Sequence, residues 1–241
     1  MGLFSRKRDS RAAGLLGLES SPHGMSLAQV LREAGAPAQL RLCQYHAADT
    51  AGQGELLKRL VVEHRLEGAA VNVLLHPSEY QMFLLEAPEV PAAELRDAMR
   101  WRVKDLISES LEEVIVDCFS LPEDAYRGRN RMVYCIVFSK PRMQHYLALV
   151  RQAGLHLQSI DITEMAFRNL GLLAGAGSVN LALLRLRTSE GLISVQNGAD
   201  IYMARRIENG LARAAQDLSG MTLEIQRSLD YYESQLGKGY I

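Results

Sequence analysis

Apolar residues recur along this chain with two spacings, the alternation of strands and the three-to-four-residue spacing of helices. Short apolar runs predict strands at residues 13–19, 25–33, 40–45, 69–75, 80–85, 114–121, 132–138, 157–162, 179–187, 192–195 and 201–206. Helical spacing predicts helices from Gln53 to Gly68, at 91–107, from Met143 to Gly154, at 164–173 and at 218–236. This mixture predicts an α/β fold built on mixed sheets.

The segment 80–121 is expected to form a strand, a proline-bounded turn, one long helix and a second strand. Its helix carries one apolar stripe, made of Leu95, Ala98, Met99, Val103, Leu106 and Ile107. Trp101 lies far around the helix from this stripe, and Arg102 falls at its edge. Trp101 either packs on a neighbouring element or forms a partner-binding surface with Arg102 and Tyr80, because Trp and Arg are enriched at binding hot spots.

The order β-β-β-α occurs twice, before and after an inserted βαββα segment, as an actin-like, ribonuclease H-like chain should show. The expected parts are a basic flexible tail (1–11), a first actin-like core subdomain (12–77 with 156–175), an inserted subdomain (78–155) and a partial second subdomain (179–241). The second copy ends at Ile241, straight after its helix. We expect the rest of this half to have been cut away, the alternative being a natural half-domain.

Five stretches together carry a family resemblance: EAPEVP (86–91), ELRDAMRWRVKDLI (94–107), VIVDCFSLP (114–122), SIDITEMAFRNL (159–170) and LEIQRSLDYYESQLGK (223–238). They resemble the MshI family of MSHA biogenesis proteins, in the PilM-like branch of the actin-like fold. The resemblance implies a cytoplasmic scaffold, peripheral on the inner face of the bacterial inner membrane, in a type IV pilus assembly platform. It implies recruitment of the short cytoplasmic tail of a bitopic, PilN- or MshJ-like partner, in a groove between the core and the inserted subdomain. Homo-oligomerisation is left open.

Actin-like ATPases hold phosphates in two small-residue turns, each after a strand that ends in an acidic residue. Glu19 stands at the metal-linked position of the first turn, which continues with Ser20, Ser21 and Gly24. Ser21 replaces an expected glycine, and Pro22 removes an N–H donor.

The second turn departs further, because Arg185 and Arg187 stand where the family has Asp and Gly. An arginine cannot coordinate Mg²⁺. We therefore expect a degenerate nucleotide site, with no catalytic residue, no metal ligand and no ATP or Mg²⁺ cofactor. The alternatives are an actin-like ATPase that gates pilus assembly, and the cytoplasmic domain of a GspL-like type II secretion platform protein.

The formal net charge of −1 argues against nucleic acid as a partner, because that function normally needs a basic face. The three cysteines fall in no C-x-x-C pair, which suits a reducing compartment. No apolar run reaches the roughly 18 residues of a membrane span. The N-terminal tail carries Arg6, Lys7, Arg8 and Arg11, so weak attraction to anionic lipid is the alternative to a solvated tail.

Overall fold

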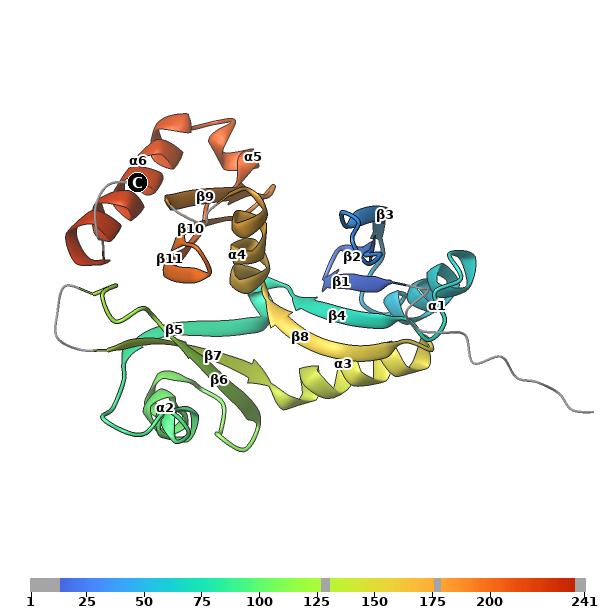
Figure 1. Cartoon of the computed structure of the whole chain (residues 1–241), viewed down its shortest axis with the longest axis horizontal. Helices are drawn as coiled ribbons and strands as arrows, with labels where there is room; N and C mark the ends of the chain where they lie inside the picture. Colours follow the sequence, from blue (N-terminus) through green and yellow to red (C-terminus); the bar gives the residue numbers. More distant parts are fainter. Residues whose placement is uncertain (1–13, 127–130, 176–178, 237–241) are drawn as a thin grey trace, which may run out of the picture. The chain divides into compact units, whose positions relative to one another are not determined.

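The computed structural model describes residues 14–126, 131–175 and 179–236 (Figure 1). The chain forms two compact units. The first unit comprises the residues up to Tyr80 together with Phe138–Thr163, and the second comprises Gln81–Val137 together with the residues from Glu164 onward. This grouping differs from the four-part division expected from the sequence, which stays a prediction. The expected basic tail lies outside the described residues.

The first unit contains a five-stranded mixed sheet with the strand order β3-β2-β1-β4-β8. Its strands are β1 (Leu15–Ser21), β2 (Gly24–Leu31), β3 (Gln39–Ala47), β4 (Ala70–Leu75) and β8 (His156–Ile162). The first three form an antiparallel meander, while β4 pairs in parallel with β1 and β8. Strands β3 and β8 are therefore the two edges of this sheet.

Alternating burial explains how the first unit is packed. Leu16 and Leu18 of β1 are buried, as are Val71 and Val73 of β4. Helices α1 (Gln53–Glu63) and α3 (Lys140–Gln152) contact each other and supply the apolar layer for this face. The buried residues of these helices are Leu56, Leu57, Leu60 and Val61 of α1 and Tyr146, Leu149 and Val150 of α3.

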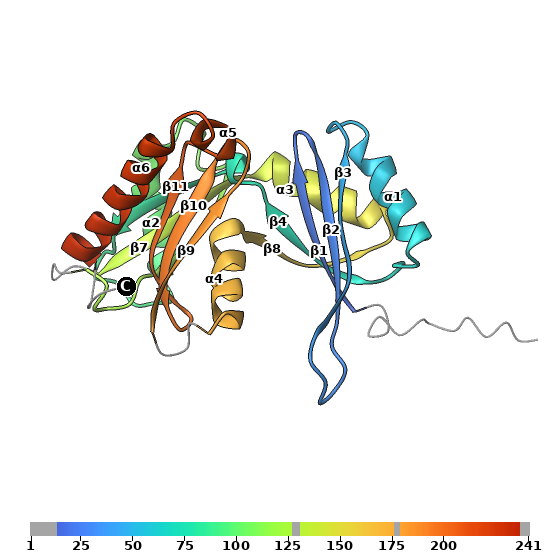
Figure 2. The same ribbon diagram turned by 90° about the horizontal axis from the view of Figure 1, so that it is seen from above.

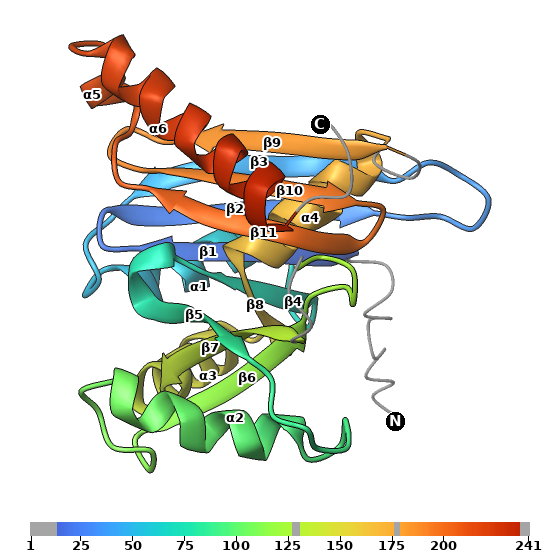
Figure 3. The ribbon, with the colours of Figure 1, turned by 90° about the vertical axis from the view of Figure 1, so that its left-hand side faces the viewer.

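The second unit contains two three-stranded sheets, with the orders β5-β7-β6 and β11-β10-β9. The first sheet consists of β5 (Tyr80–Glu86), β6 (Val114–Ser120) and β7 (Met132–Ser139), and α2 (Leu95–Val103) covers one face of it. The second consists of β9 (Asn180–Leu186), β10 (Gly191–Asn197) and β11 (Asp200–Ile207). Helices α4 (Thr163–Leu173), α5 (Leu211–Ala214) and α6 (Leu218–Tyr231) complete the unit, and α6 runs across the second sheet (Figure 3).

The structure departs from the expected elements at several points. The long helix ends at Val103, and a 3₁₀ turn, Lys104–Leu106, leaves Leu106 48% exposed instead of on the apolar stripe. Helix α5 was not expected. Helix α6 passes into a π-helical turn, Tyr232–Leu236, which accompanies the complete burial of Tyr232. Among the described residues, no helix is both long and apolar enough to cross a membrane.

Candidate functional site

The first expected phosphate turn is shorter in the structure than in the sequence pattern. Ser21 pairs with Gly24, so Glu19, Ser20 and Ser21 belong to β1 and only Pro22 and His23 form the turn. A side chain at Gly24 would lie 2.5 Å from the carbonyl oxygen of His46, which explains the glycine. The turn is closed further by Tyr45, whose hydroxyl donates to the carbonyl oxygen of His23 at 2.9 Å.

A glutamine that the sequence pattern did not single out braces this turn from α1. Gln53 is 1% exposed, and its side-chain oxygen accepts a 2.5 Å hydrogen bond from the Ser20 hydroxyl. Its amide donates to the carbonyl oxygens of Ser21 at 2.7 Å and Ala48 at 3.4 Å. Gln53 thus bonds the end of β1 beside the turn, and the hydroxyl of Ser20 is directed at Gln53.

The two carboxylates that could serve a metal ion here lie on different strands. Glu19 and Asp161 both pair with Leu74, from opposite sides of β4. Two strand spacings place their backbones about 10 Å apart. Within the described residues, no group of three or more His, Cys, Asp or Glu side chains could hold a metal ion. The Asp161 carboxylate instead accepts from the N–H of Ile162 at 2.8 Å.

The second expected phosphate turn connects β9 to β10. Arg185 forms an ion pair with Glu190 at 3.2 Å, and both side chains are about one-fifth exposed, at 20% and 23%. The N–H of Arg187 donates to the carbonyl oxygen of Glu190, and the carbonyl oxygen of Arg187 accepts from Leu211 at 2.8 Å. Gly210 packs directly on this turn, because a Cβ there would lie 2.4 Å from the Arg187 oxygen.

These contacts decide what the second turn can do chemically. The start of α5 donates to the carbonyl oxygens of Arg187 and Thr188, and the Glu190 carboxylate pairs with the Arg185 guanidinium. The sequence singles out only Arg185 and Arg187 at this turn and predicts no role for Glu190. The two turns belong to different units. The expected loss of nucleotide binding stays a prediction.

Tyr80 lies in the interior of the protein. It is 4% exposed, and its hydroxyl accepts a hydrogen bond from the N–H of Thr163 at 3.2 Å. The Thr163 hydroxyl in turn donates to the carbonyl oxygen of Leu75 at 3.3 Å. Burial leaves Tyr80 no surface for a partner, which corrects its expected place beside Trp101 and Arg102.

Trp101 and Arg102 lie next to each other on the outer side of α2. Trp101 is 68% exposed, so the interpretation that it packs on a neighbouring element is contradicted. Arg102 is exposed and donates to the carbonyl oxygen of Glu86 at 3.3 Å. An exposed Trp beside an exposed Arg is the composition of a binding hot spot.

A groove of about 460 Å³ lies in the first unit between α3 and β8. Val150 and Leu155, which are buried, and Leu147, which is 47% exposed, are among the residues that line it. The remaining lining residues are Gln144, Ala148, Arg151, His156 and Leu157. Because β8 is an edge strand, the groove lies beside a strand whose outer side has no neighbouring strand in the sheet.

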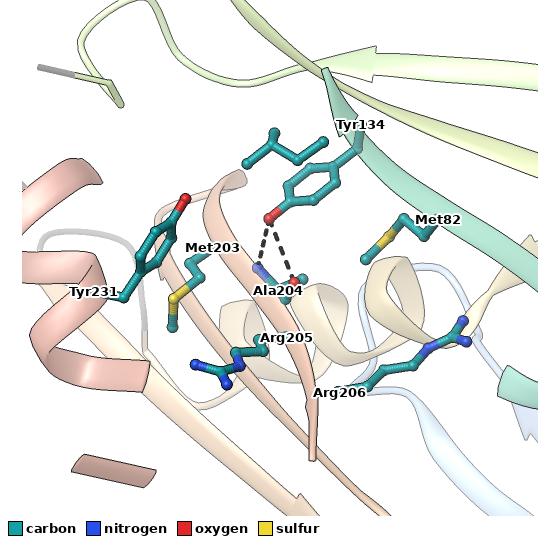
Figure 4. A pocket seen from close by; sticks show the side chains of 8 residues that line it. Met82, Tyr134, Met203, Ala204, Arg205, Arg206 and Tyr231 are labelled. Carbon is teal, nitrogen blue, oxygen red and sulfur yellow. Dashed lines mark hydrogen bonds between the residues drawn. The ribbon is translucent and has the colours of Figure 1, made fainter. Parts of the chain in front are cut away.

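A second cavity, of about 310 Å³, lies within the second unit (Figure 4). Its lining residues are Met82 and Leu84 of β5, Tyr134 of β7, Met203–Arg206 of β11 and Tyr231 of α6. Tyr134 points at β11, where its hydroxyl accepts from the N–H of Ala204 at 3.1 Å and donates to the Ala204 carbonyl oxygen at 3.4 Å. Burial raises the pKa of Tyr134 to about 12.

One buried carboxylate pairs with an arginine that lines this cavity. Glu164 is fully buried and forms an ion pair with Arg206, with Nε to Oε1 at 3.5 Å. The neighbouring Arg205 is exposed, and its side chain points away from that of Arg206 (Figure 4). The cavity is thus apolar between β5 and β11, with cationic groups at its border.

Comparison with known proteins gives no match to any family model and none to a curated protein. The fold is similar to that of solved structures. One is described as the PilM-PilN type IV pilus biogenesis complex, with TM-score 0.72, 19% identity and coverage of 92% of this chain and 78% of that chain. The chain has an actin-like fold. The expected fold class is therefore confirmed.

Two further structures agree with this fold. The cytoplasmic domain of EpsL, an inner-membrane component of the Vibrio cholerae type II secretion system, has TM-score 0.59 and 13% identity, over 85% of this chain and 74% of that chain. A Bacteroides thetaiotaomicron protein with an actin-like ATPase fold has TM-score 0.55 and 12% identity, over 92% and 80%. Membership of the MshI family stays a prediction.

Proposed function

We propose that this chain is a non-enzymatic cytoplasmic scaffold of a type IV pilus assembly platform, peripheral on the inner membrane. In this role it recruits the cytoplasmic tail of a bitopic, PilN- or MshJ-like membrane protein. The observation that carries the proposal is the similarity to the PilM-PilN complex structure over 92% of this chain. The resemblance of five sequence stretches to MshI proteins points the same way.

The groove between α3 and β8 is the proposed seat of the tail. An extended peptide alongside the free edge of β8 would gain main-chain hydrogen bonds. One of its apolar side chains would then cover Val150 and Leu155, beside Leu147. By the boundaries expected from the sequence, α3 belongs to the inserted subdomain and β8 to the core. The groove would then lie between these two parts, and the family resemblance implies that the tail binds between them.

The degenerate turns support a scaffold over the alternative of an ATPase. Gln53 bonds the Ser20 hydroxyl and the Ser21 carbonyl oxygen beside the first turn. At the second turn, Arg185 pairs with Glu190 and stands where an ATPase of this fold has a metal-linked carboxylate. Assembly would then be controlled by the partner and not by nucleotide state.

A second candidate function is the cytoplasmic domain of a GspL-like secretion platform protein. The similarity to the EpsL cytoplasmic domain favours it. A membrane-spanning helix encoded downstream of Ile241 would assign the chain to this class. A soluble continuation would favour the PilM-like role.

The proposal is tested by fluorescence anisotropy with a labelled synthetic peptide that covers the cytoplasmic tail of the PilN-like protein from the same organism. Saturable binding in the micromolar range supports recruitment, with a scrambled peptide as the control. Equal signals from the native and scrambled peptides would contradict it.

A further inference from the structure

Two of the three cysteines lie opposite each other on neighbouring strands of the second unit. The N–H of Leu121 donates to the carbonyl oxygen of Met132 at 2.9 Å, which fixes how β6 pairs with β7. The two strands follow each other along the chain as a hairpin and therefore run antiparallel. Moving back along β6 and forward along β7 from this bond places Cys118 opposite Cys135.

The packing of the neighbouring side chains supports this register independently. The same register places Phe119 opposite Tyr134, and the centroids of these two rings are 5.3 Å apart. Phe119 and Tyr134 pack in one core cluster, whereas Cys118 and Cys135 pack in the other, beneath α2. Because successive side chains of a strand alternate between its two faces, both thiols lie on the face of the sheet that α2 covers. Helix α2 lies beyond β7 in the view of Figure 2.

The position of this pair in the ladder suits a disulfide bond. Leu121 and Met132 form a hydrogen-bonded pair, and hydrogen-bonded and non-hydrogen-bonded pairs alternate along an antiparallel ladder. Cys118 and Cys135, three steps further along, therefore form a non-hydrogen-bonded pair, in which the Cα atoms lie about 4.5 Å apart with the side chains close together. Disulfides join Cα atoms that are roughly 4.4–6.8 Å apart. The two sulfur atoms can thus be joined without a change of register.

The two thiols differ in how well they can be reached. Cys118 is partly exposed, whereas Cys135 is fully buried, so a small oxidant meets Cys118 first. Burial raises the pKa of the Cys118 thiol and raises the pKa of Cys135 to about 12. Little of either thiol is ionised at neutral pH, and the thiolate is the reactive form. The pair therefore responds to sustained oxidation and not to brief exposure.

We propose that Cys118 and Cys135 are an oxidative modification site, at which hydrogen peroxide forms an intramolecular disulfide. The Cys118 thiolate attacks one peroxide oxygen, the O–O bond breaks, and the leaving hydroxide takes up the proton that Cys118 has lost. The Cys135 sulfur then attacks the sulfur of the Cys118 sulfenic acid, the S–O bond breaks, and hydroxide leaves as water with the proton of Cys135. The two thiols lose two electrons and two protons, and one peroxide is reduced to two molecules of water.

The disulfide joins two of the three strands on which α2 rests. Met99 and Val103 of α2 pack in the same core cluster as both cysteines. The bond also closes the chain between β6 and β7 into a loop, which lowers the conformational freedom of the unfolded protein. Oxidation therefore stabilises the sheet beneath the helix that presents Trp101.

The first test uses the Cys43→Ser protein, which retains Cys118 and Cys135. After treatment with hydrogen peroxide, the protein is unfolded and alkylated, and its intact mass is measured. We expect a monomer that is lighter by two hydrogen atoms and takes up no alkyl group, whereas the untreated protein takes up two. Dithiothreitol should restore both thiols. Two alkylated thiols after sustained treatment would overturn the proposal.

The matched control is the Cys43→Ser/Cys118→Ser/Val116→Cys protein, which also has one thiol on each strand facing α2. Position 116 is diagonal to Cys135, and diagonal neighbours lie about 7–8 Å apart, at or beyond the limit for a disulfide. Disulfide formation should be at least about tenfold slower in this control than in the Cys43→Ser protein. Circular dichroism verifies that both proteins fold. Equal rates would overturn the register on which the proposal depends.

The second test needs no relocated cysteine. The oxidised Cys43→Ser protein should unfold at a midpoint about 5 °C or more above that of its reduced form, because the disulfide restricts the unfolded chain. The Cys43→Ser/Cys135→Ser protein, which has one thiol, should show no such rise after the same treatment. An oxidised protein with an unchanged or lower midpoint would overturn the proposed bond between paired strands.

Discussion

The hydroxyl of Ser20 donates a 2.5 Å hydrogen bond to the side-chain oxygen of Gln53, which lies 33 positions away in the chain. Both side chains are buried, and the Gln53 amide also donates to the carbonyl oxygen of Ser21. The start of α1 is thereby fixed to the end of β1. In this chain, the segment that precedes a phosphate-binding turn in an actin-like ATPase connects β1 to α1 through hydrogen bonds.

Replacing Gln53 by Ala should destabilise the protein. The change removes the acceptor of Ser20 and a donor to Ser21, and an unsatisfied buried polar group costs about 1–3 kcal/mol. Urea denaturation measures this loss. The control is Gln152→Ala, at an exposed position of α3, which should stay within about 0.5 kcal/mol of the parent. Equal stability of both variants would contradict the bracing role.

Deprotonation of Tyr134 should cause part of the loss of folding stability at alkaline pH. Its pKa is raised by burial to about 12 in the folded protein, against about 10 when unfolded. As the pH rises, the Tyr134 hydroxyl therefore stays protonated longer in the folded protein than in the unfolded chain. The stability that this proton contributes is complete below about pH 10 and is lost as the pH rises through about 12. The Tyr134→Phe variant should be less stable at neutral pH, because Ala204 loses its hydroxyl partner, yet its stability should fall less between pH 10 and 12. Parallel stability curves for variant and parent would refute this.

Trp101→Ala tests a contact with the partner other than the groove between α3 and β8; it should weaken partner binding and leave the fold intact. Trp101 is 68% exposed, so its loss should change the free energy of unfolding by less than about 0.5 kcal/mol. Removal of a hot-spot Trp typically costs about 2 kcal/mol or more of binding free energy. The measurement is titration of the variant with the partner's cytoplasmic segment, beside thermal unfolding. Unchanged affinity would remove Trp101 from the partner surface.

Leu147→Asp tests the groove between α3 and β8. A carboxylate beside Val150 and Leu155 should disfavour an apolar anchor and weaken tail binding about tenfold or more, since one buried apolar side chain contributes about 1.5–3 kcal/mol. The matched control is Val62→Asp, which places the same charge at a 67% exposed position of α1. If both variants bind the tail as the parent does, the tail lies elsewhere.

The fold could be predicted from the sequence because its signals are local. Alternation in β1 and β4 and the helical spacing of α1 each lie within one element. The dipeptide Asn197-Gly198 is a common hairpin signal, and in the structure Gly198 and Ala199 connect the paired residues Asn197 and Asp200 of β10 and β11. Such signals need no knowledge of distant contacts.

The candidate site was less predictable because its decisive contacts join distant residues. In the sequence, Gln53 is an ordinary residue at the start of a helix. Its role depends on hydrogen bonds to β1, which only the structure shows. The sequence suggests that Tyr80 is a surface aromatic residue. In the structure its hydroxyl accepts a hydrogen bond from the N–H of Thr163, 83 positions away. Glu190 is only five residues from Arg185, and the hairpin geometry alone makes the two an ion pair. Local pattern contains none of these relationships.

The most direct test of the scaffold role is isothermal titration of the purified chain, first with Mg-ATP and then with the synthetic partner tail. We predict no heat of binding from Mg-ATP and saturable, micromolar binding of the tail, unchanged by added nucleotide. Saturable binding of Mg-ATP would contradict the account and favour a nucleotide-gated actin-like ATPase. Absence of tail binding would contradict recruitment itself.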